Sequence, residues 1–207
     1  MHSEEDKKRK KDTIVEAAMK AFAELGYEKT KISDVAARAG IGKGSFYDYF
    51  KSKEELVLEV VERIIQKHNS QSEEIVEGEM PTIDKLQLLY QSDMNIIRNY
   101  GDKCAKPNLM AISDVEDFPE KMRNLMFSFF GNEIDIYTRV LELGVEKGEI
   151  RPLNTKLAAI LIMGATAGYI NVSERWPDYF SKVVDREDRD SGYRYFLEMV
   201  VQGIGAE

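Results

Sequence analysis

The chain has 207 residues, of which 43% are hydrophobic and 32% charged, so it can bury a core and is not expected to be disordered. A single cysteine, Cys104, excludes an intramolecular disulfide and fits a reducing compartment, and because no signal peptide is visible we expect a cytoplasmic protein. The net charge of −8 argues by itself against nucleic-acid binding.

The charge is unevenly distributed along the chain, however. Residues 7–53 carry twelve Lys or Arg against six Asp or Glu, a local +6, which leaves seventeen against thirty-one, or −14, for the rest. Residues 1–11 are polar and include the run KKRKK. Two interpretations of this run stay open: a solvated terminus, or a basic arm that follows the phosphate backbone or enters the minor groove of DNA.

The first helix is predicted over 12–25 from the helical spacing of its apolar residues, and Gly26 ends it. Thr30 and Lys31 come just before the next helix, where a hydroxyl and backbone amides can hold a phosphate.

Ser33 is predicted to cap the next helix by accepting a hydrogen bond from the amide of Ala36, and Val35, Ala36 and Ala39 give this helix an apolar stripe. Gly40 begins a Gly-Ile-Gly turn that breaks this helix, because glycine adopts positive φ at low cost.

A second short helix, predicted over 43–50, buries Phe46 and Phe50 on one face. The small residue Ala36, the turn Gly40 and the anchor Phe46 have the spacing of a helix-turn-helix. The opposite face presents groups that can donate to phosphates or base edges, with a glycine that permits close approach: Lys43, Gly44, Ser45, Tyr47 and Tyr49.

Ser52 is predicted to cap a long helix whose apolar pattern fades between residues 70 and 79. No alternation typical of β-strands occurs anywhere, so the sequence predicts an all-α fold. The remaining helices are predicted over 82–99, 107–113 (a short piece), 119–146, 154–173 and 191–204, with an irregular charged connection over 176–190.

Several function classes lack support in the sequence. No set of His, Cys and carboxylates has metal-ligand spacing, and no nucleophile with a base or phosphate-binding glycine loop is visible, so we expect no metal, no cofactor and no enzyme. The apolar run over 157–172 is shorter than the ~20 residues that span a bilayer and contains two glycines, so we expect a buried helix and no membrane partner.

The motifs of the N-terminal quarter together resemble a known DNA-binding domain, that of the tetracycline-repressor (TetR) family of bacterial regulators, over residues 14–56. Asp48 departs from the family pattern, because many relatives have an aromatic or neutral residue at this position. A carboxylate beside phosphates is unfavourable, so Asp48 either faces away from the DNA or accepts a hydrogen bond from a cytosine amine. The matching residues are Ala17-Ala18, Phe22, Gly26-Tyr27, Thr30, Ile32, Val35-Ala36, Ala39-Gly40-Ile41, Lys43-Gly44-Ser45-Phe46-Tyr47 and Tyr49-Phe50-Lys51-Ser52-Lys53-Glu54-Glu55-Leu56.

The resemblance implies an N-terminal three-helix DNA-binding head, 1–53, joined by a long fourth helix to a helical effector-binding and dimerisation domain, 54–207. It implies a homodimer on a palindromic operator of double-stranded DNA, with two recognition helices in successive major grooves roughly 34 Å apart. A small hydrophobic effector would release this repressor. The expected DNA contacts are Thr30, Lys31, Ser33, Lys43, Gly44, Ser45, Tyr47, Tyr49 and Lys53.

Two further sets of residues follow for the larger domain. The dimer interface is expected to include Leu161, Gly164, Gly168, Val172, Tyr193, Leu197, Val200, Val201 and Ile204, although these residues can also simply close a monomeric core. The effector pocket, or otherwise plain core, is expected to include Met94, Ile97, Tyr100, Met110, Phe118, Met122, Met126, Phe130, Tyr137, Met163 and Tyr169. The alternative function is a helical ligand carrier or scaffold without DNA binding, which salt-dependent binding to duplex DNA would exclude.

Overall fold

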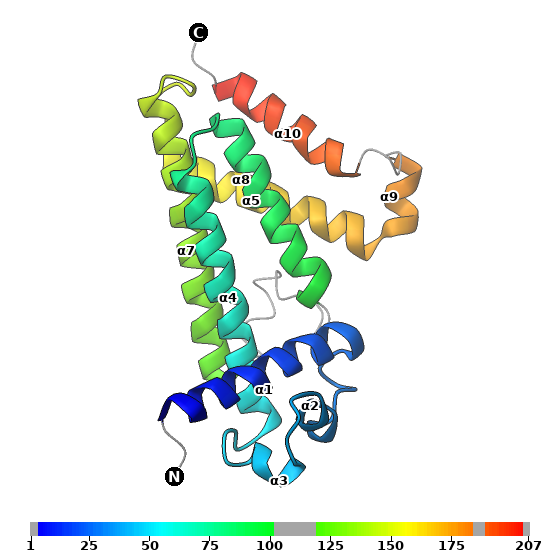
Figure 1. Ribbon diagram of the computed structural model, residues 1–207. Coiled ribbons are helices and arrows are strands. Elements are labelled where there is room, and N and C mark those ends of the chain that lie inside the picture. Colours follow the sequence, from blue (N-terminus) through cyan, green and yellow to red (C-terminus); the bar gives the residue numbers. More distant parts are fainter. Residues whose placement is uncertain (1–3, 102–118, 184–188, 205–207) are drawn as a thin grey trace. The chain divides into compact units, whose positions relative to one another are not determined.

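The computed structural model describes residues 4–101, 119–183 and 189–204 (Figure 1). These residues form helices and contain no β-strand, which confirms the predicted all-α fold. The chain divides into two compact units: residues 1–67 with 95–125, and residues 68–94 with 126–207. No helix among the described residues is long and apolar enough to cross a membrane.

The first unit holds the N-terminal helices around a small apolar core. The buried side chains include Ile14 and Phe22 of α1, Val35 of α2, and Phe46 and Phe50 in and after α3. The helices are α1 (Glu4–Leu25), α2 (Ile32–Arg38), α3 (Lys43–Phe46), the first part of α4 (Lys53–Glu77) and a π-helical turn, η1 (Ile97–Gly101).

Helix α1 begins at Glu4, eight residues before the predicted start, so the basic run is helical. Its first turn is acidic, which suits the positive end of the helix dipole. Lys11 Nζ lies 2.6 Å from Glu59 Oε2, and Asp12 pairs with Arg63, so two side chains of α1 are held by α4 within this unit.

The helix ends of this unit follow the predicted glycines, with one error at a cap. Gly26 and Gly40 adopt φ of 80° and 69°. Ser52 caps α4 as predicted, because its Oγ accepts from the amide of Glu55 at 3.2 Å. The predicted cap of α2 is wrong: α2 begins one residue before Ser33, and the carboxylate of Asp34 accepts from the backbone N–H of Lys31 instead.

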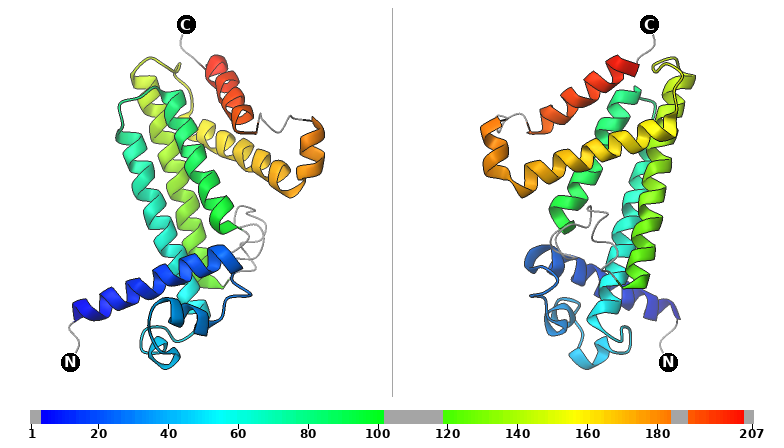
Figure 2. Two further views of the ribbon diagram at one scale, coloured as in Figure 1. Left: turned by 45° about the vertical axis from the view of Figure 1, so that its right-hand side comes forward. Right: turned by 180° about the vertical axis from the view of Figure 1, so that it is seen from behind.

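The second unit packs the C-terminal part of α4, from residue 68, beside α5 (Thr82–Ile96) and α7 (Glu120–Glu146), and α8 (Thr155–Arg175) crosses α5 (Figure 2). Asn154 caps α8 by accepting from the amide of Leu157 at 3.0 Å. Helix α10 (Arg189–Ile204) packs through Tyr193, whose ring stacks on Tyr90 with centroids 3.5 Å apart and whose hydroxyl lies 2.8 Å from Thr166 Oγ1.

The predicted helices over 119–146, 154–173 and 191–204 are confirmed to within a few residues. Two predictions are wrong in this half of the chain. Residues 177–183, expected to be irregular, form α9 (Pro177–Val183), and the helix predicted over 82–99 ends at Ile96 and continues as η1. The short piece predicted over 107–113, together with Met110, Phe118 and Cys104, lies outside the described residues.

Candidate nucleic-acid interface and buried polar cluster

The candidate nucleic-acid interface is built on α3, which is shorter than predicted. Only Lys43–Phe46 is α-helical, and after it the amides of Tyr47 and Tyr49 donate to the carbonyls of Gly44 and Phe46, three residues back, at 3.1 and 3.0 Å. The chain therefore tightens into turns of the 3₁₀ type, where the prediction had a regular helix to Phe50.

Two aromatic anchors fix this segment to the core of its unit. Phe46 and Phe50 are buried, and their rings stack with centroids 5.6 Å apart. The ring of Tyr47 stands edge-on to Phe46 at 5.4 Å, yet 51% of Tyr47 is exposed. With these two rings fixed in the core, the opposite side of the segment is exposed. This exposed surface consists of Lys43, Gly44, Ser45 and Tyr47.

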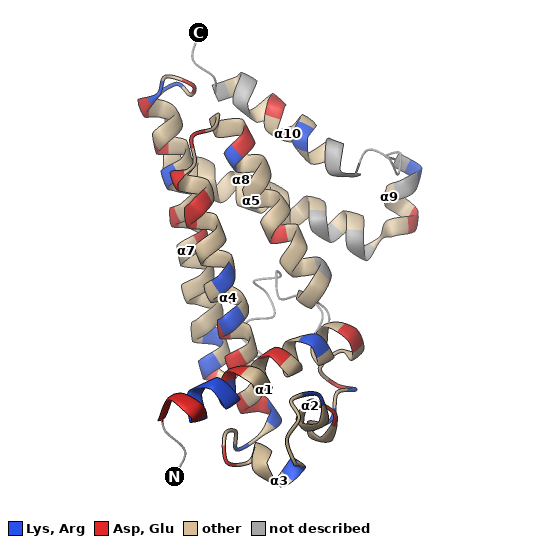
Figure 3. Ribbon diagram, in the orientation of Figure 1, with Lys and Arg blue, Asp and Glu red and all other residues tan. Residues whose placement is uncertain are grey.

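The lysines around this surface are either exposed or engaged with other groups (Figure 3 colours Lys and Arg blue). Lys31, Lys43 and Lys51 are exposed and form no ion pair with any residue that the structure describes. Lys53 is engaged: its Nζ lies 4.1 Å from the centroid of the Tyr27 ring and donates to the carbonyl of Glu28 at 3.4 Å. The three exposed lysines are therefore free to meet phosphates.

One predicted DNA contact lies elsewhere than expected. Thr30 is buried, and its hydroxyl donates to the carbonyls of Gly26 at 2.8 Å and Ala21 at 3.2 Å, so it stabilises the turn after α1 rather than facing a phosphate. Ser33 is exposed but donates to Asp34 Oδ1 at 3.3 Å. Tyr49 is half-buried.

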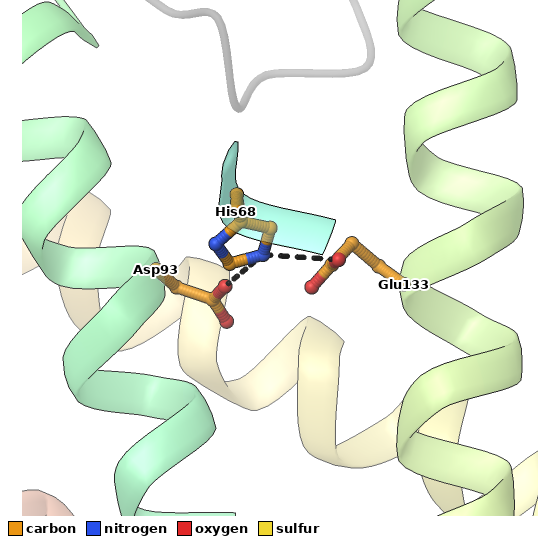
Figure 4. A group of neighbouring side chains, drawn as sticks. All are labelled: His68, Asp93 and Glu133. Carbon is orange, nitrogen blue, oxygen red and sulfur yellow. Dashed lines mark hydrogen bonds and ion pairs between the residues drawn. The ribbon is translucent and has the colours of Figure 1, made fainter. Parts of the chain in front are cut away.

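The second unit contains a buried polar cluster of His68 from α4, Asp93 from α5 and Glu133 from α7 (Figure 4). His68 Nε2 lies 3.0 Å from Glu133 Oε1 and 3.4 Å from Asp93 Oδ1. The three nitrogen and oxygen atoms all lie within 4.8 Å of one another. Figure 4 shows both carboxylates directed at the imidazole ring, which lies between them.

Three hydroxyl groups contact this cluster. Ser92 Oγ lies 3.0 Å from His68 Nδ1, and the hydroxyl of Tyr137 donates to Asp93 Oδ2 at 2.9 Å. Ser72, one turn after His68, places its Oγ 3.4 Å from Nε2.

Burial and charge shift the pKa values of the cluster. Burial and then the charge of Glu133 raise the pKa of Asp93 to about 8, against the opposing influence of His68 and Tyr137. Burial lowers the pKa of His68, but its hydrogen bond and charge interaction with Glu133 outweigh burial and leave the pKa raised. Burial, followed by Asp93, raises the pKa of the Tyr137 hydroxyl well above its usual range.

The residues expected to form an effector pocket are divided between the two units. Met94, Met126, Phe130, Tyr137, Met163 and Tyr169 belong to the second unit, and Ile97, Tyr100 and Met122 to the first. Met94, Met126 and Tyr137 are buried in the core of the second unit, and Tyr169 stands edge-on to Phe180 at 5.5 Å.

The residues expected at a dimer interface separate into an exposed and a buried group. Leu161 is 64% exposed, and a Cβ added at Gly164 or Gly168 would meet no atom within 4 Å. Tyr193 and Leu197 are instead fully buried, because α10 turns them into the core of its own unit. Val172 and Val200 are half-buried, and the side chains of Val201 and Ile204 lie outside the described part of the structure.

Comparison with known proteins identifies the DNA-binding segment. Residues 14–60 match the domain of the bacterial regulatory proteins of the tetR family, and this range contains α2, α3 and the turn between them. The chain therefore contains a DNA-binding domain of the tetR family at residues 14–60. It is therefore a DNA-binding transcriptional regulator.

Relatives of this regulator match well beyond the DNA-binding domain. The HTH-type transcriptional regulator YhgD of Bacillus subtilis is 27% identical over 160 residues, which cover 74% of this chain and 78% of YhgD. The HTH-type transcriptional repressor KstR2 of Mycobacterium tuberculosis is 28% identical over 172 residues, 79% of this chain and 78% of KstR2. The crystal structure of FadR from Bacillus subtilis in complex with stearoyl-CoA shares the fold, with a TM-score of 0.66, 22% identity and coverage of 93% and 98%.

The polar cluster of this regulator was not predicted from the sequence, although the sequence carries a signal for it. His68 continues the apolar stripe of α4, four residues after Ile64 and three after Ile65. Asp93 and Glu133 likewise occupy positions on the buried faces of α5 and α7. Polar residues at positions that helical periodicity buries are expected to find partners in the core, and here they find one another.

Proposed function

We propose that this regulator is a homodimeric repressor that binds a palindromic operator and is released by a small apolar effector. The observation that carries the proposal is the exposed surface Lys43, Gly44, Ser45 and Tyr47, mounted on the buried rings of Phe46 and Phe50. Rigid anchoring matters because a donor discriminates between bases only when its position is fixed. KstR2 of Mycobacterium tuberculosis, which is similar over most of its length, is a repressor, and this supports repression rather than activation.

In this proposal Lys31, Lys43 and Lys51 contact phosphates, whereas Ser45 and Tyr47 reach base edges. The three lysines are exposed and have no partner ion among the described residues, so their charge is available to the duplex. Gly44 lets the backbone approach closely. Lys53 acts indirectly, by holding Tyr27 through a cation–π contact at the start of α4.

The proposed dimer is formed by α8 and α10. Helix α8 exposes an apolar stripe at helical spacing, Leu157, Ile160, Leu161, Gly164 and Gly168, and α10 exposes Tyr195 and Met199, one turn apart. Apolar surface of this extent on a soluble protein marks an interaction site. A second copy fits it best, because a two-fold dimer would present two recognition segments to two half-sites.

The proposed effector is an apolar molecule received by the apolar side chains of the domain that follows residue 53. The solved structure of FadR, which has the same fold, contains stearoyl-CoA, and this supports a ligand with a long apolar part. Helix α4 is shared between the two compact units, so a change in its packing in the second unit is a direct route to the first. A near-complete switch needs the effector to prefer one state by about 5 kcal/mol.

The test is selection of DNA from random duplexes by the purified full chain, followed by gel shifts. We expect a palindrome whose half-sites lie about one helical turn apart. Tyr47→Ala should abolish specific binding while circular dichroism remains unchanged, and Leu161→Glu should convert a dimer to a monomer in light scattering. Selection of no sequence, or a palindrome bound equally well by Tyr47→Ala, would contradict the proposal.

A further inference from the structure

We propose that His68, Asp93 and Glu133 form a binding site for one divalent transition-metal ion. One imidazole nitrogen and two carboxylate oxygens are a donor set that suits ions of the Zn²⁺, Fe²⁺ and Mn²⁺ class. The three residues come from α4, α5 and α7, so the ion would join three helices of one compact unit.

The spacing of the donor atoms suits such an ion. Metal–ligand distances of about 2.0 to 2.2 Å place neighbouring ligand atoms roughly 3.0 to 3.5 Å apart in tetrahedral or octahedral geometry. His68 Nε2 lies 3.0 Å from Glu133 Oε1 and 3.4 Å from Asp93 Oδ1. Only the separation of the two carboxylates, at most 4.8 Å, has to contract, and both side chains have rotatable bonds that permit it.

The surrounding hydroxyl groups orient the donors as in metal sites. A ligating histidine usually engages its other ring nitrogen in a hydrogen bond, and here Ser92 Oγ lies 3.0 Å from His68 Nδ1. Tyr137 binds the outer oxygen of Asp93, Oδ2. The inner oxygen, Oδ1, is buried and accepts no hydrogen bond from the residues that the structure describes, so it is directed at His68 with unused acceptor capacity.

Charge balance also favours a dication. A neutral imidazole with two ionised carboxylates, the form in which these groups bind a metal, carries −2, which one divalent ion cancels. In the metal-free protein the raised pKa values of Asp93 and His68 let protons compensate this charge, so the ion would bind by displacing protons. All three residues are buried, and uncompensated charge is costly there. Three protein ligands leave a further coordination position, as in sites that accept water or an incoming ligand.

The experiment uses untagged full-length protein carrying His2→Ala and Cys104→Ser, so that His68 is the only histidine and no thiol competes. The chelator-treated protein is titrated with Co²⁺ as the probe. We expect one Co²⁺ per chain with visible d–d absorption, displacement by Zn²⁺, and X-ray absorption that shows the multiple-scattering signature of one imidazole within a shell of nitrogen and oxygen ligands. Metal should also raise the unfolding temperature.

Variants separate this site from adventitious binding. Asp93→Asn and Glu133→Gln should weaken Co²⁺ binding at least about 100-fold, and Ser92→Ala about 10-fold. The matched control is Asp135→Asn, which removes an exposed carboxylate two residues from Glu133 and should change nothing. Absence of stoichiometric Co²⁺ in the parent protein, or affinity unchanged in Glu133→Gln, would overturn the proposal. If a variant fails to fold, the ligands seen by X-ray absorption in the parent protein still decide.

Discussion

Replacement of Lys43 by Gln should lower DNA affinity through the salt-dependent part of binding alone. Lys43 is exposed at the start of α3 and has no partner ion among the described residues, so the substitution removes a charge without breaking an internal contact. Each phosphate contact contributes about 0.9 to the slope of log K against log salt, so a dimer loses about 1.8. Between 50 and 200 mM salt the affinity of the parent protein should therefore fall about 12-fold more than that of the variant.

The assay is fluorescence anisotropy on the selected operator at several salt concentrations. Lys147→Gln is the matched control, because it removes the same charge from an exposed lysine in the other unit and should leave the slope unchanged. Tyr47→Phe should behave differently: it removes only a hydroxyl donor, costs about 1 to 3 kcal/mol on the operator and leaves the slope and non-specific binding intact. An unaltered slope in Lys43→Gln with normal helicity would refute the assignment of Lys43 to a phosphate.

Three stability predictions follow from the contacts of each unit, all measured by denaturant unfolding. Phe46→Ala should cost about 3 to 5 kcal/mol and abolish DNA binding, because it empties a fully buried site. Thr30→Val should cost about 1 to 2 kcal/mol, since two carbonyls lose their hydroxyl donor. Glu149 accepts from the amide of Thr82 at 2.6 Å, and this bond lowers its pKa, so its stabilisation is present at neutral pH and is lost as the pH falls through the lowered pKa. Glu149→Gln should cost about 1 kcal/mol at pH 7 and nothing in strong acid.

The long apolar helices could be predicted because periodicity alone determines them, as the agreement at α7 and α8 shows. The start of α1 could not be predicted in this way, because the first half of the helix is polar and has no apolar stripe. It is held by contacts distant in sequence, Lys11 with Glu59 and Asp12 with Arg63. Helix α9 had a usable signal, a proline followed by an acidic residue at Pro177 and Asp178, which is typical of a first helical turn.

The two candidate sites also differ in how far the sequence could predict them. The outward surface of α3 follows from local spacing, because Phe46 and Phe50 must face the core and their neighbours must then face out. The engagement of Lys53 with Tyr27 depends on a turn 26 residues earlier, and the polar cluster joins residues up to 65 positions apart. Sequence patterns indicate that such residues are buried, but only the packing of helices shows which of them meet.

The polar cluster also selects one alignment of α4, α5 and α7. Apolar contacts are non-directional and tolerate small shifts, whereas a shift of α5 by one residue turns Asp93 by about 100° and takes its carboxylate from His68. A buried charge without its partner costs about 3 to 5 kcal/mol, so the shifted alignment is excluded. Glu133→Met alone should therefore destabilise the metal-free protein by about that amount. Replacement of all three residues, by His68→Leu, Asp93→Leu and Glu133→Met, should preserve or raise the free energy of unfolding. A triple variant less stable than Glu133→Met would show that the cluster stabilises the fold outright, and would refute this account of its role.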